Sequence, residues 1–146
     1  MSDAVKAFKN ELASYPILKD QLAERKKQLD QIQYIMNGVR AVRADSEPHG
    51  NAPEGNRIIL YLARKEAVES EIKRLCERLA YVDDVLEFMN EYERYIINEH
   101  YNNNRTYADI ADELGYTTNW IMQKVDKEIE VCIRAYENTV FDQVEK

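Results

Sequence analysis

Apolar residues recur three and four positions apart along most of this chain, and this spacing constrains its fold more than any other feature. Side chains at that spacing share one face of an α-helix, whereas those of a half-buried strand alternate. In residues 3–39, the stripe consists of Val5, Phe8, Leu12, Tyr15, Leu18, Leu22, Leu29, Ile32, Met36 and Val39. Such a stripe predicts the seam of a coiled coil or of a helical hairpin. Pro16 suits the first turn of a new helix that Ser14 would cap, so we expect an interruption there.

A break in the spacing separates this segment from the next. Residues 41–57 hold two of the three prolines and two of the four glycines, which predicts a loop. Beyond it, we expect one helix that begins near Asn56 and closes at about Tyr101. Its main stripe consists of Tyr61, Val68, Ile72, Leu75, Leu79, Val82, Leu86 and Met89. Residues 1–92 are therefore expected to form a long antiparallel helical hairpin.

A second apolar stripe appears near the end of this helix. It contains Val85, Phe88, Tyr92 and Tyr95, so two faces of the helix are apolar there. A helix that is apolar on two faces is expected to be covered from two sides. One face can pair with the first long helix, and the other can receive the C-terminal residues or a second subunit.

Composition agrees with an all-α fold of one domain or two small ones. The chain has 146 residues with only four glycines and three prolines, and strand-forming residues are sparse. Cys76 and Cys132 lie within helical patterns, so we expect packed, reduced thiols in the cytoplasm. There is no signal-peptide pattern and no apolar run near the roughly 18 residues of a membrane span, so we expect no membrane partner.

Chemistry-bearing motifs are missing from the sequence. It holds no Ser/His/Asp set, no paired metal ligands and no phosphate-binding loop. We therefore expect no enzymatic activity, no catalytic residues, no metal site and no cofactor.

The segment TYADIADELGYTTNWIMQK, residues 106–124, has the spacing of a helix-turn-helix. Thr106 can cap the first helix, and Gly115 can supply a turn with positive φ. Thr117 can then cap a second helix, which is expected to run from Thr118 to about Val144, roughly 40 Å at 1.5 Å per residue. Residues expected to face inward are Ile110, Ala111, Leu114, Ile121 and Val125, while Tyr116 should lie beneath the turn. We expect residues 93–146 to form this C-terminal domain.

The register of the second helix assigns a candidate DNA-reading face. Asn and Gln suit bidentate contacts to adenine, and Thr and Met suit the thymine methyl group. The predicted base-reading residues are Thr118, Asn119, Met122 and Gln123. The predicted phosphate contacts are Arg105, Tyr107, Lys124 and Lys127. Trp120 lies at the edge of this face, where it can close the core or stack against a neighbour.

The net charge of −7 and the pI near 5.0 argue against a protein that coats nucleic acid. Asp109, Asp112, Glu113 and Asp126 lie around the motif and would repel phosphates unless they are turned away. Binding by a monomer should be weak, so avidity from a homodimer or from a DNA-bound partner is expected.

The order of parts resembles the ArpU/RinA-type phage transcriptional regulators, with a C-terminal unit similar to region 4 of bacterial sigma factors. The resemblance rests on YPILKDQL, GVRAVRADSEPHGN and EYERYIINEHYNNNRTYADIADELGYTTNWI. It implies a sequence-specific DNA-binding regulator in the bacterial host cell, and it adds Thr117 to the DNA-reading face. Such a regulator would activate late phage or prophage genes together with RNA polymerase. The recognition helix differs from sigma-like ones, which carry several outer arginines, by having Thr118, Trp120 and Met122.

Two functions stay open at this point. The first is a dimeric regulator that binds double-stranded DNA through residues 117–124. The second is an acidic helical adaptor that docks RNA polymerase or another phage protein, with weak or no direct DNA binding.

Overall fold

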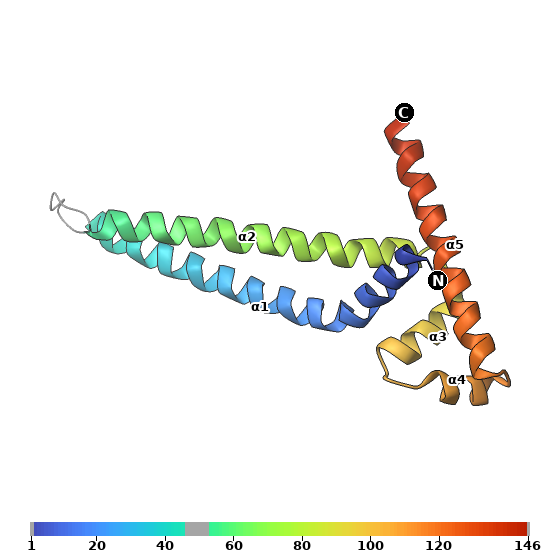
Figure 1. Ribbon diagram of the computed structural model, residues 1–146. Coiled ribbons are helices and arrows are strands. Elements are labelled where there is room, and N and C mark those ends of the chain that lie inside the picture. Colours follow the sequence, from blue (N-terminus) through green and yellow to red (C-terminus); the bar gives the residue numbers. More distant parts are fainter. Residues whose placement is uncertain (1, 46–52, 146) are drawn as a thin grey trace. The chain divides into compact units, whose positions relative to one another are not determined.

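The computed structural model describes residues 2–45 and 53–145, and the side chains of residues 2–38 and 56–141. All secondary structure in these ranges is helical, so the all-α prediction is confirmed (Figure 1). The helices are α1 (Asp3–Asp45), α2 (Pro53–Leu86), α3 (Glu91–Tyr101), α4 (Tyr107–Leu114) and α5 (Thr118–Glu145). No described helix is long and apolar enough to cross a membrane.

The chain divides into two compact units. One is Ile17–Glu77, and the other joins Met1–Pro16 to Arg78–Lys146. This division differs from the domain boundary after Tyr92 that the sequence suggested. The reason is that the first turns of α1 and the last turns of α2 contribute to the same core as α3, α4 and α5.

The unit Ile17–Glu77 contains parts of α1 and α2, which lie side by side and run in opposite directions (Figure 1). Its buried apolar residues are members of the predicted stripes: Leu18, Ile32, Met36 and Leu75. Ion pairs between side chains of one helix, such as Arg74 with Glu71 at 2.7 Å, lie on its surface. Exposed pairs of this kind contribute only tenths of a kcal/mol, ~0.3–0.5, so packing along the stripes carries the stability.

The second unit has one core to which all five helices contribute. Its buried residues are Val5, Phe8, Leu12, Val82, Val85, Met89, Ile96, Ile97, Ile110, Ala111, Ile121, Val125, Ile129, Cys132 and Ile133. Tyr81 packs edge-on against both Phe8 and Tyr136, with ring centroids 6.0 and 5.3 Å apart. These contacts join α1, α2 and α5 in a single apolar cluster.

Polar bonds at the edge of this core hold the start of α1 in place. Arg78 pairs with Glu11, and the Tyr15 hydroxyl donates to Asp83 at 2.8 Å. Burial and this neighbouring carboxylate raise the pKa of Tyr15 to about 12. The expected interruption at Pro16 is wrong, because α1 continues through it. Tertiary packing on both sides outweighs a cost of about 3 kcal/mol for an internal proline.

The helix boundaries around the predicted loop also differ from expectation. The backbone of residues 41–45 and 53–57 is helical, and the rest of the predicted loop, 46–52, lies outside the described residues, as does His49. Three arginines flank the predicted loop: the side chains of Arg40 and Arg43 are not described, and Arg57 is exposed. Pro53 occupies the first position of α2, where its missing N–H is not needed by the helix.

The long helix expected over residues 56–101 is two helices. α2 ends at Leu86, and α3 begins at Glu91 after a turn. Asn90 caps α3, because its side-chain oxygen accepts a hydrogen bond from the Glu93 backbone N–H at 3.2 Å. An Asn followed three residues later by Glu is a known helix-start pattern, so the sequence contained the signal for this break.

The two cysteines have different surroundings. Cys132 is fully buried in the second unit, as expected, and burial raises its pKa to about 11. Cys76 is exposed, so the expectation of a packed thiol is wrong there. It follows the buried Leu75 by one position and therefore falls outside the apolar stripe of α2.

Candidate nucleic-acid interface

α4 and α5 are joined by residues 115–117, and local chemistry sets both helix ends. The Thr106 hydroxyl accepts from the Asp109 backbone N–H, and the Thr117 hydroxyl accepts from that of Trp120. Gly115 ends α4 with φ of 80° and donates its N–H to Ala111. The predicted caps and the positive φ are therefore confirmed, and together they fix where α5 begins.

Packing then fixes the register of α5. Ile110, Ile121 and Val125 are fully buried, and Ala111 is 2% exposed, in agreement with the predicted inward set. Leu114 packs at the edge of the same core. With this face of α5 buried, the residues between the buried ones are left for the surface.

The predicted base-reading side chains are all exposed at the start of α5. Thr117 and Thr118 lie at its first turn, followed by Asn119, Met122 and Gln123. Met122, the apolar member of the set, is 41% exposed. The set contains no charge, and it offers amide, hydroxyl and methyl groups.

The side chains predicted to contact phosphates are less available for DNA binding than the sequence suggested. Lys127 is exposed, but Lys124 lies 3.7 Å from the carboxylate of Glu93 on α3. Glu93 is almost completely buried, and its second carboxylate oxygen has no hydrogen-bond partner among the described residues. A buried carboxylate needs a counter-charge, so Lys124 is held toward the protein.

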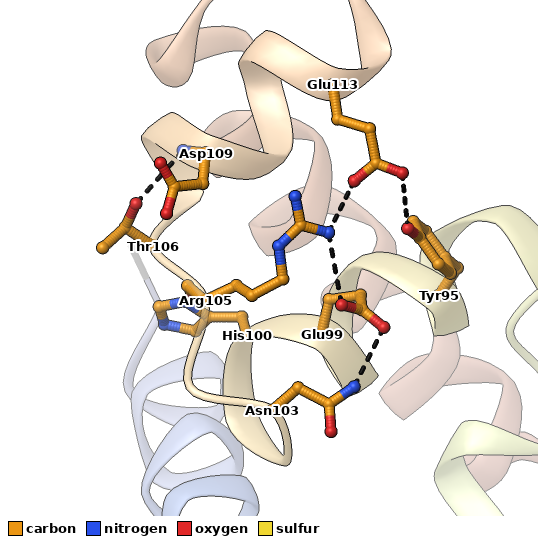
Figure 2. Close-up of polar contacts among 8 residues, drawn as sticks. All are labelled: Tyr95, Glu99, His100, Asn103, Arg105, Thr106, Asp109 and Glu113. Carbon is orange, nitrogen blue, oxygen red and sulfur yellow. Dashed lines mark hydrogen bonds and ion pairs between the residues drawn. The ribbon is translucent and has the colours of Figure 1, made fainter.

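Arg105 is also engaged within the protein. Figure 2 shows its guanidinium group between the carboxylates of Glu99 and Glu113, which lie on α3 and α4. The hydroxyl of Tyr95 donates to Glu113 at 2.7 Å, and Asn103 donates to Glu99 at 2.9 Å. Hydrogen bonds from Tyr95 and then from Arg105 lower the pKa of Glu113. This network ties α3 to α4 and satisfies the charge of Arg105.

Tyr107 contributes to packing at the start of α4. Its ring stacks on His100 with centroids 3.8 Å apart, and its hydroxyl is buried. Burial, with Tyr101 as a second cause, raises the pKa of Tyr107. His100 Nδ1 lies 2.7 Å from the Arg105 carbonyl oxygen, so the ring acts as a packing residue at the helix end.

Four half-exposed aromatic side chains form a surface beside the start of α5, here named the aromatic surface: Tyr92, Tyr95, Tyr116 and Trp120. Tyr116 was expected beneath the turn, but its ring is 46% exposed and stacks on Trp120, with centroids 4.0 Å apart and planes 17° apart. Desolvation and then the adjacent Tyr116 hydroxyl raise the pKa of Tyr92. Sequence reasoning did not identify this surface, although the four-residue spacing of Tyr116 and Trp120 would permit the stack.

Charge is distributed unevenly between the two units. Residues 1–16 and 78–146 carry nine Lys/Arg and seventeen Asp/Glu, whereas residues 17–77 carry eleven and ten. Two of the four acidic groups expected to oppose DNA are paired with cations, and one of these is Asp126, which lies 2.8 Å from Lys9. Glu113 is paired with Arg105, while Asp109 and Asp112 are exposed.

Comparison of the chain with protein-family models, with curated proteins and with solved structures finds no significant match. The resemblance to phage regulators therefore stays a prediction.

Proposed function

We propose that the chain is a sequence-specific DNA-binding transcription regulator of a phage or prophage. In this proposal, α4, residues 115–117 and the start of α5 form a helix-turn-helix, and α5 enters the major groove. The observation that carries it is the contrast between two faces of α5. Ile121 and Val125 are fully buried, while Asn119 and Gln123 are exposed with no charge between them. Activation of late genes is the role that the family resemblance implies.

The exposed residues match the chemistry of A·T base pairs. The amides of Asn119 and Gln123 can each donate and accept on the edge of an adenine, and Thr118 and Met122 can contact thymine methyl groups. The grip on phosphates is expected to be weak, because Arg105 and Lys124 already pair with carboxylates. A homodimer, or RNA polymerase bound beside it, would supply the missing affinity.

In vitro selection from a random duplex library, followed by footprinting at low salt, tests this proposal. The wild-type chain should enrich an A·T-containing site. Asn119→Ala and Gln123→Ala should each lower affinity for that site by ~1–3 kcal/mol and relax its sequence preference. Asn138→Ala is the matched control, because Asn138 is exposed on the same helix but far from its start. Selection without any enriched sequence would overturn the proposal.

A second function is favoured by charge. The unit that contains α4 and α5 has eight more acidic than basic residues, which opposes binding to a polyanion. The chain would then act as an adaptor that docks RNA polymerase or another phage protein. A co-purification in which polymerase is retained by Asn119→Ala, Gln123→Ala and wild type alike would favour the adaptor. If these variants lose polymerase binding together with DNA binding, the adaptor function is contradicted.

A further inference from the structure

The aromatic surface is contiguous and open to solvent. Its members, Tyr92, Tyr95, Tyr116 and Trp120, are each between 38% and 46% exposed. Tyr92 and Tyr95 come from α3, Tyr116 from the α4–α5 connection and Trp120 from α5. Tyr116 stacks on Trp120, and its hydroxyl lies beside that of Tyr92, so the parts meet at Tyr116. Aromatic side chains that remain this exposed together, and not scattered singly, are typical of interaction sites.

Acidic groups lie beside two members of this surface. Glu91 precedes Tyr92 on α3 and is exposed, and Glu113 accepts the hydrogen bond from Tyr95 while it pairs with Arg105. The unit as a whole has eight more acidic than basic residues. The exposed Glu91 carboxylate and this excess favour a cationic partner over a phosphate.

One cation of the chain itself already occupies the edge of the surface. Lys124 Nζ lies 5.8 Å from the centre of the Trp120 ring while it pairs with Glu93. A positive group thus gains from both an aromatic face and a carboxylate at this position. The exposed rings of Tyr92 and Tyr116 offer further aromatic area for a cation from a partner.

We propose that the aromatic surface binds an arginine-rich segment of another protein. The inference rests on the second proposed function, docking of a protein, and names its site and the chemistry of its partner. A guanidinium group can stack on an aromatic ring and bond a carboxylate at the same time, which an ammonium group does less well. A second copy of this unit fits poorly, because it brings the same excess of acidic residues.

The single tryptophan of the chain makes a direct test possible. Trp120 fluorescence is titrated with deca-arginine and with deca-lysine, which have the same length and charge. Deca-arginine is expected to bind about fivefold more tightly than deca-lysine, because stacking adds to charge attraction. Equal affinities for the two peptides would overturn the proposal, since charge alone explains them.

Variants locate the site. The double variant Glu91→Gln/Tyr92→Ser should weaken deca-arginine binding about tenfold, and Glu91→Gln alone should weaken it by a smaller factor. The matched control Glu24→Gln/Tyr34→Ser makes the same changes at exposed positions of the other unit and should bind like wild type. The proposal is contradicted if the control loses as much affinity for deca-arginine as the double variant does. It is also contradicted if Glu91→Gln and the double variant bind deca-arginine like wild type while their thermal melting is unchanged.

A parallel DNA titration separates this inference from the proposed DNA function. The Glu91/Tyr92 variant should keep its sequence preference for DNA, and Asn119→Ala should keep its affinity for deca-arginine. The proposed binding of an arginine-rich segment would also be overturned if a second copy of the chain displaced deca-arginine. Such displacement would be seen as self-association in sedimentation.

Discussion

Lys124 on α5 lies 3.7 Å from Glu93 on α3, so a lysine placed beside the candidate reading face is paired with a buried carboxylate. The pairing reduces the positive charge that α5 offers to a phosphate. It also gives the buried charge of Glu93 its nearest cationic partner among the described residues.

Removing that carboxylate should strengthen non-specific DNA binding. Glu93→Gln frees Lys124, so affinity for a random duplex is expected to rise about three- to tenfold at low salt. The slope of log affinity against log salt should become steeper by about 0.9. Fluorescence anisotropy at several salt concentrations measures both. Glu137→Gln changes net charge equally at an exposed position farther along α5. An equal gain in this control would show that net charge alone is responsible.

Because Gly115 has a left-handed backbone conformation, we expect its replacement by alanine to destabilise the fold. A Cβ at this position meets no atom within 4 Å, so Gly115→Ala is opposed by backbone conformation alone. With φ of 80°, the substitution should lower the free energy of unfolding by about 1–2 kcal/mol. Gly38→Ala is the control, because Gly38 lies within helix α1 with free space around it. That change should stabilise the protein by about 0.5–1 kcal/mol. Urea denaturation followed by circular dichroism measures the change in the free energy of unfolding for each variant. Changes of the same sign in the two variants would contradict the left-handed conformation of Gly115.

The Glu113 network predicts a dependence of stability on pH. Hydrogen bonds from Tyr95 and Arg105 lower the pKa of Glu113 from its ordinary 4.5. The carboxylate therefore stabilises the fold fully above that value, and the contribution is lost as pH falls through the lowered pKa. Glu113→Gln should melt below wild type at pH 7, and the difference should shrink on acidification. Glu87→Gln, an exposed turn position, should show no such trend. A Glu113→Gln difference that is the same at every pH would refute the network's role.

The two thiols should react at very different rates. Cys76 is exposed, whereas Cys132 is fully buried and its pKa is raised to about 11 by burial and then by neighbouring acidic residues. Thiolate is the reactive form, so one equivalent of Ellman's reagent should react rapidly with native protein and a second only on unfolding. Cys76→Ser should abolish the rapid phase, and Cys132→Ser should retain it. Rapid labelling of native Cys76→Ser would show that Cys132 is accessible.

Features set by neighbouring residues in the chain could be predicted from the sequence. The caps of α4 and α5, the positive φ of Gly115 and the burial of Ile121 and Val125 each depend on a few adjacent positions. The apolar stripes of α1 and α2 likewise follow from spacing alone. The break before α3 was predictable in principle from Asn90 and Glu93, but the apolar pattern runs across it and hides it.

Features set by distant residues could not be predicted in this way. The partners of Arg105 and Lys124 lie on other helices, so sequence spacing could not show that both cations are engaged. Continuation of α1 through Pro16 depends on contacts such as Tyr15 with Asp83, which are 68 positions apart. The aromatic surface, too, exists only when α3 is placed beside the α4–α5 connection.

The contribution of Val5, Phe8 and Leu12 to the core shared with α5 limits how this protein can be subdivided. A fragment starting at residue 93 would lack three buried side chains from α1 as well as Val82, Val85 and Met89. The candidate DNA-reading helix is therefore not expected to fold when it is transferred alone to another protein. Such a transfer would also have to include the first turns of α1, which are distant from it in the sequence.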